Sequence, residues 1–91
     1  MKLICEKDTH IVKFIVADES SVDIHEDRIE VYGSHRFNVN DLNESNAYVT
    51  QTTVAQPDDW LGNKYVINQS SEENIADTWT LNADWIDPDS L

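Results

Sequence analysis

The chain has 91 residues, with six Lys or Arg against eighteen Asp or Glu, and its formal net charge at pH 7 is −12. Its hydrophobic fraction of 40%, with three Trp, three Tyr and two Phe, is too high for a disordered acidic tail. The apolar runs are far shorter than the roughly 20 residues that span a bilayer, and no apolar targeting segment follows Met1. We therefore expect one folded domain, residues 1–91, with an acidic C-terminal tail, residues 82–91, and no membrane contact.

β-Branched and aromatic residues that alternate with polar ones predict strands along most of the chain. A first hairpin is expected around Lys7-Asp8-Thr9, and a second around Gly33-Ser34-His35. Gly62-Asn63 indicates a bulge or tight bend, and residues 68–77 a polar loop. The segments expected to be extended are residues 2–6, 10–16, 22–24, 28–32, 36–39, 48–54, 60–67 and 78–81.

One helix start is visible. Asp41 has the properties of an N-cap, and Glu44 stands three residues later, in the spacing of a capping box. Only about one turn fits before the β-branched stretch that follows. The expected fold class is therefore all-β, a small antiparallel sandwich or curled sheet with at most one short helix near residue 41. An α+β fold with a longer helix there is the alternative.

The inward phase of the expected strands gives a candidate core. Its members are Ile4, Val12, Phe14, Val31, Phe37, Tyr65 and Trp79.

Few residues in the chain suggest chemistry. Cys5 and His10 approach each other across the first hairpin, but a Cys–His pair without a third positioned group is weak support for a nucleophile. The three histidines and one cysteine lack metal-site spacing, and two glycines make no phosphate-binding loop. Asp84, Asp87 and Asp89 do not match a calcium loop and are interpreted as a solvated tail. We expect no enzyme, no cofactor and no metal.

The charge distribution is more informative. No Lys or Arg follows Lys64, and a second acidic cluster lies between Asp18 and Glu30. Such a surface repels nucleic acid and attracts basic protein surfaces. It is typical either of electrostatic solubility and steering, which we favour, or of a mimic of DNA. We expect protein partners and no direct contact with nucleic acid.

Four aromatic residues gather in the last third of the chain. Trp60, Tyr65 and Trp79 are expected to build the core of the C-terminal hairpin, whereas Trp85 lies in the acidic tail and is the best candidate to dock elsewhere. Its anchor is either this domain's own sheet or a neighbouring subunit. The candidate partner-binding residues are Trp85, Ile86, Trp60, Asp84 and Asp87.

Two segments carry a resemblance. Residues 57–67 begin Pro-Asp-Asp-Trp-Leu-Gly-Asn-Lys-Tyr, and residues 78–85 read Thr-Trp-Thr-Leu-Asn-Ala-Asp-Trp. They resemble short acidic proteins of tailed bacteriophages, especially those of marine and cyanobacterial hosts, in which a Pro-acidic-acidic-Trp-x-Gly-x-Lys-Tyr segment precedes a Trp-x-x-Asn-x-x-Trp ending. The loop 68–77 is longer than the tight turn expected between them. The resemblance implies a virion component or a small accessory protein made during infection.

The resulting hypothesis is a non-enzymatic bacteriophage structural protein, present in many copies and attached to the capsid or tail surface of the virion. Its partners would be other virion subunits or further copies of itself. The alternative is a small acidic inhibitor in the host cytoplasm that binds a basic site on a host protein.

Overall fold

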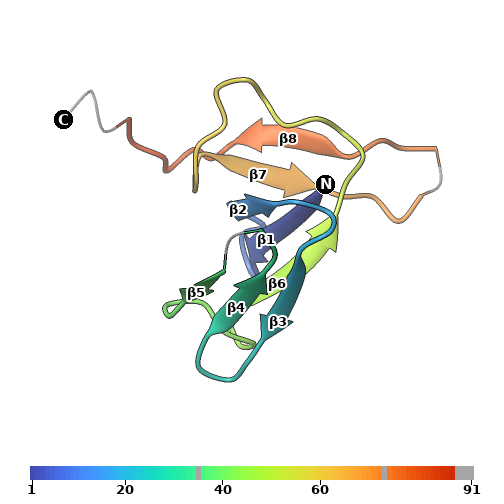
Figure 1. Ribbon diagram of the computed structural model, residues 1–91. Helices are drawn as coiled ribbons and strands as arrows, with labels where there is room; N and C mark the ends of the chain where they lie inside the picture. Colours follow the sequence, from blue (N-terminus) through green and yellow to red (C-terminus); the bar gives the residue numbers. More distant parts are fainter. Residues whose placement is uncertain (35, 73, 88–91) are drawn as a thin grey trace.

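The computed structural model describes residues 1–34, 36–72 and 74–87, and in these ranges it contains eight strands and no helix (Figure 1). They form three antiparallel sheets, with strand orders β2-β1-β6, β3-β4-β5 and β7-β8. The all-β antiparallel fold expected from the alternation is therefore confirmed. The strands are β1 (Lys2–Glu6), β2 (Val12–Val16), β3 (Ser21–Ile24), β4 (Ile29–Tyr32), β5 (Phe37–Val39), β6 (Ala47–Gln51), β7 (Tyr65–Asn68) and β8 (Thr78–Leu81).

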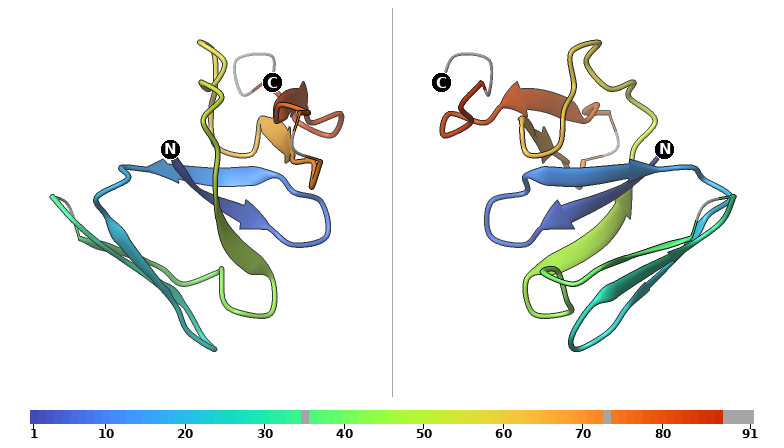
Figure 2. Two further views of the ribbon diagram at one scale, coloured as in Figure 1. Left: turned by 90° about the vertical axis from the view of Figure 1, so that its right-hand side faces the viewer. Right: turned by 60° about the vertical axis from the view of Figure 1, so that its left-hand side comes forward.

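Strand β1 is covered on both faces. Its three central residues Leu3, Ile4 and Cys5 are each 0% exposed, although consecutive side chains of a strand point in opposite directions. Ile4 packs into a core shared with the β3-β4-β5 sheet, whereas Leu3 and Cys5 pack into a second core with Ile67 of β7. Figure 2 shows the β2-β1-β6 sheet between the other two. The fold thus has three layers and two cores.

A register shift in β2 distributes its side chains between these cores. Ile4 pairs with Phe14, but Cys5 pairs with Val12, so Lys13 is left as an extra residue opposite β1. In a regular strand Val12 and Phe14 would share a face. The bulge instead turns Val12 to the second core, while Phe14 packs against the first.

The C-terminal hairpin joins the first sheet beside this bulge. Val66 forms an isolated bridge with Ile11, and the Asn63 amide donates to the Val12 carbonyl at 3.1 Å. The tight bend expected at Gly62-Asn63 is present, with the left-handed conformation on Asn63, whose φ is 73°. A Cβ on Gly62 would lie 3.2 Å from the Lys13 carbonyl oxygen. Glycine therefore permits the bend to pass closely over the bulge.

The helix start at Asp41 is not used. Residues 40–46 form bends and a turn instead. Asn43 accepts hydrogen bonds at its Oδ1 from the amide and hydroxyl of Ser45, and the Asn46 side chain binds the amide of Asn43 and the carbonyl of Asp41. These asparagine contacts offer the backbone a turn in place of a helix.

The predicted core is correct in part. Ile4, Val12 and Val31 are buried. Phe14, Tyr65 and Trp79 are only half-buried. Phe37 was predicted wrongly, because it is 38% exposed. It stands opposite Val31, at the start of the short outermost strand β5. Its ring contacts that of Phe14, with 5.9 Å between the ring centroids, but the rest of the side chain is exposed to solvent.

None of the residues described lies in a helix that is long and apolar enough to span a membrane.

Replacement of Ile4 by Ala should lower the free energy of unfolding by about 2–5 kcal/mol, because it opens a cavity where the first core meets β1. Phe37→Ala should cost about 1 kcal/mol, chiefly through the lost contact with Phe14. Urea denaturation of the two variants checks both values. Equal losses of unfolding free energy in the two variants would contradict the placement of Phe37 at the edge of the first core.

Candidate protein-binding face

One end of the C-terminal hairpin gathers a cation, an acid and two aromatic rings. Lys64 Nζ lies 2.9 Å from Asp59 Oδ2 and 4.7 Å from the ring centroid of Trp85. Tyr65 donates its hydroxyl hydrogen to Asp59 Oδ1 at 2.7 Å. The hydrogen bond from Tyr65, followed by that from Lys64, lowers the pKa of Asp59. We call these four residues the Lys64 cluster.

The Lys64 cluster brings Trp85 into contact with its own domain. The ring is half-buried against Lys64 of its own domain, and the Trp85 amide donates to the Asn82 carbonyl at 3.1 Å. In this structure the tail is thus anchored internally. Ile86, the next residue, is 63% exposed.

The remaining candidate residues do not join this cluster. Trp60 is half-buried against the second core, and its indole N–H has no hydrogen-bond partner in the part of the chain that the structure describes. Asp84 and Asp87 are exposed on the tail. Asp89 lies outside the described residues. The five candidates thus divide into an internal anchor, a core residue and three exposed tail residues.

Sequence reasoning missed Lys64 and Asp59 as the place where Trp85 binds. A signal was present, because Lys64 is the last cation in the chain and is followed by several acids and two Trp. A lone cation among aromatic residues is a candidate for a cation–π contact.

All six Lys and Arg side chains are held by contacts within the fold. Lys2 and Lys7 donate to the carbonyls of Ser20 and Glu44, and Lys13 pairs with Glu6. Arg28 pairs with Asp27 and Glu30, Arg36 lies over the ring of Tyr32, and Lys64 binds as above. The cations are therefore held at internal contacts, while the acids outnumber them by twelve.

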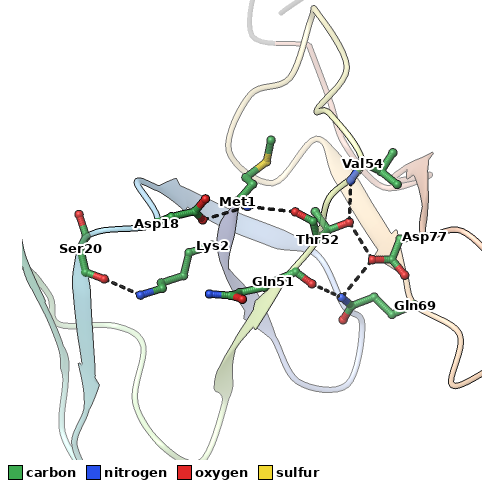
Figure 3. Close-up of polar contacts among 9 residues, drawn as sticks. All are labelled: Met1, Lys2, Asp18, Ser20, Gln51, Thr52, Val54, Gln69 and Asp77. Atoms are coloured by element: carbon green, nitrogen blue, oxygen red, sulfur yellow. Dashed lines mark hydrogen bonds and ion pairs between the residues drawn. The ribbon is translucent and has the colours of Figure 1, made fainter. Parts of the chain in front are cut away.

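A polar network fixes the chain just before β8 (Figure 3). Thr52, which is 4% exposed, donates its hydroxyl hydrogen to Asp77 Oδ2 at 2.7 Å. Gln69 donates through Nε2 to the Gln51 carbonyl at 2.8 Å and lies 3.4 Å from the same Asp77 oxygen. An open pocket of about 530 Å³ lies beside the network, with Asp18 and Asp77 in its lining. Because Asp77 directly precedes β8, the network positions the start of that strand.

Tyr48 contacts both Cys5 and His10. The Tyr48 hydroxyl lies 2.7 Å from His10 Nδ1 and is also hydrogen-bonded to Cys5. Burial raises the pKa of the Cys5 thiol to about 11 and, together with the Cys5 contact, raises the pKa of Tyr48 to about 12. The thiol is thus neutral at physiological pH, which is the opposite of an activated nucleophile.

Within the described ranges, no three His, Cys, Asp or Glu side chains are grouped so that they could hold a metal ion.

No family model, curated protein or solved structure matches this chain.

The Cys5 pKa predicts a pH dependence of stability. The folded-state value is raised from 9.0 to about 11, so the native state binds the proton more tightly than the unfolded state does. This contribution is complete below pH 9 and is lost as the pH rises towards 11, by up to ~1.4 kcal/mol per pH unit. Urea denaturation at several pH values should show a steeper loss for the native sequence than for Cys5→Ala. The same pH dependence of the unfolding free energy in both proteins would contradict the raised pKa of Cys5.

Removal of the Lys64 charge should release the tail. In Lys64→Gln the Trp85 ring loses its cation, so the indole resonance of Trp85 should move towards its position in an unfolded chain, and the tail should be cleaved faster by a protease. Lys7→Gln is the matched control, because the Lys7 side chain donates to the Glu44 carbonyl in a distant loop. A tail that stays protected in Lys64→Gln would show that Trp85 is held by other contacts.

Proposed function

We propose that this chain is a non-enzymatic structural protein of a tailed bacteriophage, present in many copies on the capsid or tail surface and attached there through a basic site on another virion subunit. The observation that carries the proposal is the internal use of all six cations. A protein with a charge of −12 and its cations held internally favours a basic partner surface, which relieves its self-repulsion.

Binding is favoured over catalysis by the state of the most reactive side chain. Cys5 is fully buried and its pKa is raised, so it does not supply a thiolate. The resemblance of residues 57–67 and 78–85 to phage proteins points to the virion. The structure adds a reason for that pattern, because Asp59, Lys64, Tyr65 and Trp85 of these two segments bind one another.

A second candidate function is an acidic inhibitor that occupies a basic site on a host protein in the host cytoplasm. It is favoured by one feature of the β3–β4 hairpin. Asp23 stands directly opposite Glu30 on the two strands, and Glu26 and Asp27 occupy the turn between them. Arg28 already pairs with Glu30 and Asp27, so a cationic partner would be attracted mainly by Asp23 and Glu26.

Mass spectrometry of gradient-purified phage particles tests the leading proposal. The chain should be present in stoichiometric amounts after a high-speed pellet and nuclease treatment, with an abundant host protein as the control for contamination. A chain found only in the lysate supernatant would overturn the virion role. In that case competition with DNA for a basic host protein, weakened by added salt, would support the inhibitor instead.

A further inference from the structure

The outer edge of β8 is open. In an antiparallel pair, residues alternate between those that exchange backbone hydrogen bonds with the partner and those whose groups point away from it. The Asn82 amide donates to the Lys64 carbonyl at 2.8 Å, which places this pair in the bonded class. The next pair, Leu81 with Tyr65, therefore belongs to the other class, and so does Trp79 with Ile67.

The direction of Ile67 agrees with this assignment. Its amide turns away from β8 and donates to the His10 carbonyl at 3.1 Å, beside the bridge that joins β7 to the first sheet. On β8 the corresponding groups of Trp79 and Leu81 point to the opposite side. In the part of the chain that the structure describes, β7 is the only strand paired with β8, and the contact of Trp79 with the Val54 carbonyl is made by its indole N–H and not by its backbone. These amides and carbonyls are thus free to pair with an additional strand.

The outer edge of β6, by contrast, is partly covered. The Ala47 amide donates to the Asn43 carbonyl, and the Gln51 carbonyl accepts a hydrogen bond from Gln69. Natural edge strands also avoid pairing through Lys, Pro, bulges or short length. The four residues of β8, Thr78 to Leu81, contain no charge, proline or glycine, and Leu81 is 56% exposed. Of these two edges, β8 is the better template for strand addition.

Both ends of β8 are fixed before any partner binds. Asp77 is held by Thr52 and Gln69 at the start (Figure 3). At the end, Asn82 Nδ2 donates to the Asn63 carbonyl at 2.9 Å. A preformed edge saves a partner the entropic cost of ordering it.

Charge selects the partner. Asp77 precedes β8 and Asp84 follows it, and no Lys or Arg occurs after Lys64. A second copy, paired antiparallel along β8, would bring the Asp77 end of one copy beside the Asp84 end of the other, and both copies carry −12. A basic segment would instead be attracted by the net charge of −12 and by the exposed Asp84 after β8.

We propose that the β8 edge accepts an extended, Lys- or Arg-rich segment of a partner protein as an additional strand. The bound segment pairs with the backbone groups of Trp79 and Leu81, and its cations are attracted by the exposed Asp84 and by the net negative charge of the chain. Strand addition of this kind derives affinity from main-chain hydrogen bonds and specificity from the flanking side chains. That the partner is a virion subunit rests on the function proposed above.

The test is an NMR titration of the ¹⁵N-labelled full chain with a synthetic peptide, acetyl-KTVKVTK-amide. The Trp79 and Leu81 amides should shift and become protected from solvent exchange, and added salt should weaken binding. The same peptide N-methylated at every residue, so that it cannot donate from either edge, should bind at least tenfold more weakly. A peptide with Glu in place of each Lys should not bind.

Leu81→Pro removes the outward donor and should abolish binding of the unmodified peptide, whereas Leu81→Ala should retain it. Because the Leu81 amide points away from β7, the proline is compatible with the fold. The N-methylated peptide keeps the test valid if that variant does not fold.

Three outcomes would overturn the inference. The first is a set of shifts confined to other elements, and the second is equal binding of the methylated peptide. The third is a dimer of the chain that buries β8, seen by sedimentation in high salt, because the occupant would then be a second copy. Each of these outcomes leaves the particle analysis untouched. Absence from particles together with peptide binding at β8 would overturn the virion role alone.

Discussion

The whole fold depends on the burial of β1 on both faces. Leu3, Ile4 and Cys5 are consecutive and fully buried, so the strand needs a layer on each side. The β3-β4-β5 sheet supplies one layer and the C-terminal hairpin the other. A domain of this size buries only a modest core. Because two small cores share strand β1, the domain can bury its apolar residues without a single large interior.

The alternation of apolar and polar residues predicted the strands well, because register on a half-buried sheet is set by that alternation. Burial was harder to predict. Phe37 lies on the inward face of its strand, as predicted, but at the edge of the first core. The alternation shows which face a residue is on, but not how far the sheet packed against that face extends. The three layers were not predicted either, since the bulge at Lys13 sends Val12 to a different face from Phe14. No helix forms at Asp41, which agrees with the prediction of at most one short helix, because asparagine side chains bind the backbone locally.

The candidate binding face was predictable in composition and not in arrangement. The excess of acids and the tail aromatics are visible in the sequence, and they indicate a basic protein partner. The contact between Trp85 and Lys64 depends on a bend at Asn63 that brings Lys64 beside the tail. Such a contact between residues distant in the chain follows from the turn geometry, which the sequence indicates only as a bend.

The bridge between Ile11 and Val66 has a consequence for how the protein opens. Together with the hydrogen bonds from the Asn63 amide to Val12 and from the Ile67 amide to His10, it joins the backbone of the C-terminal hairpin to the first sheet. Units connected in this way separate from the rest of a protein at a lower free energy than global unfolding requires. Opening of the hairpin would expose Leu3, Cys5 and Val12 to water while Ile4 stays covered. Amide hydrogens in β7 and β8 would then exchange through a partly open state, and the thiol of Cys5 would report its population.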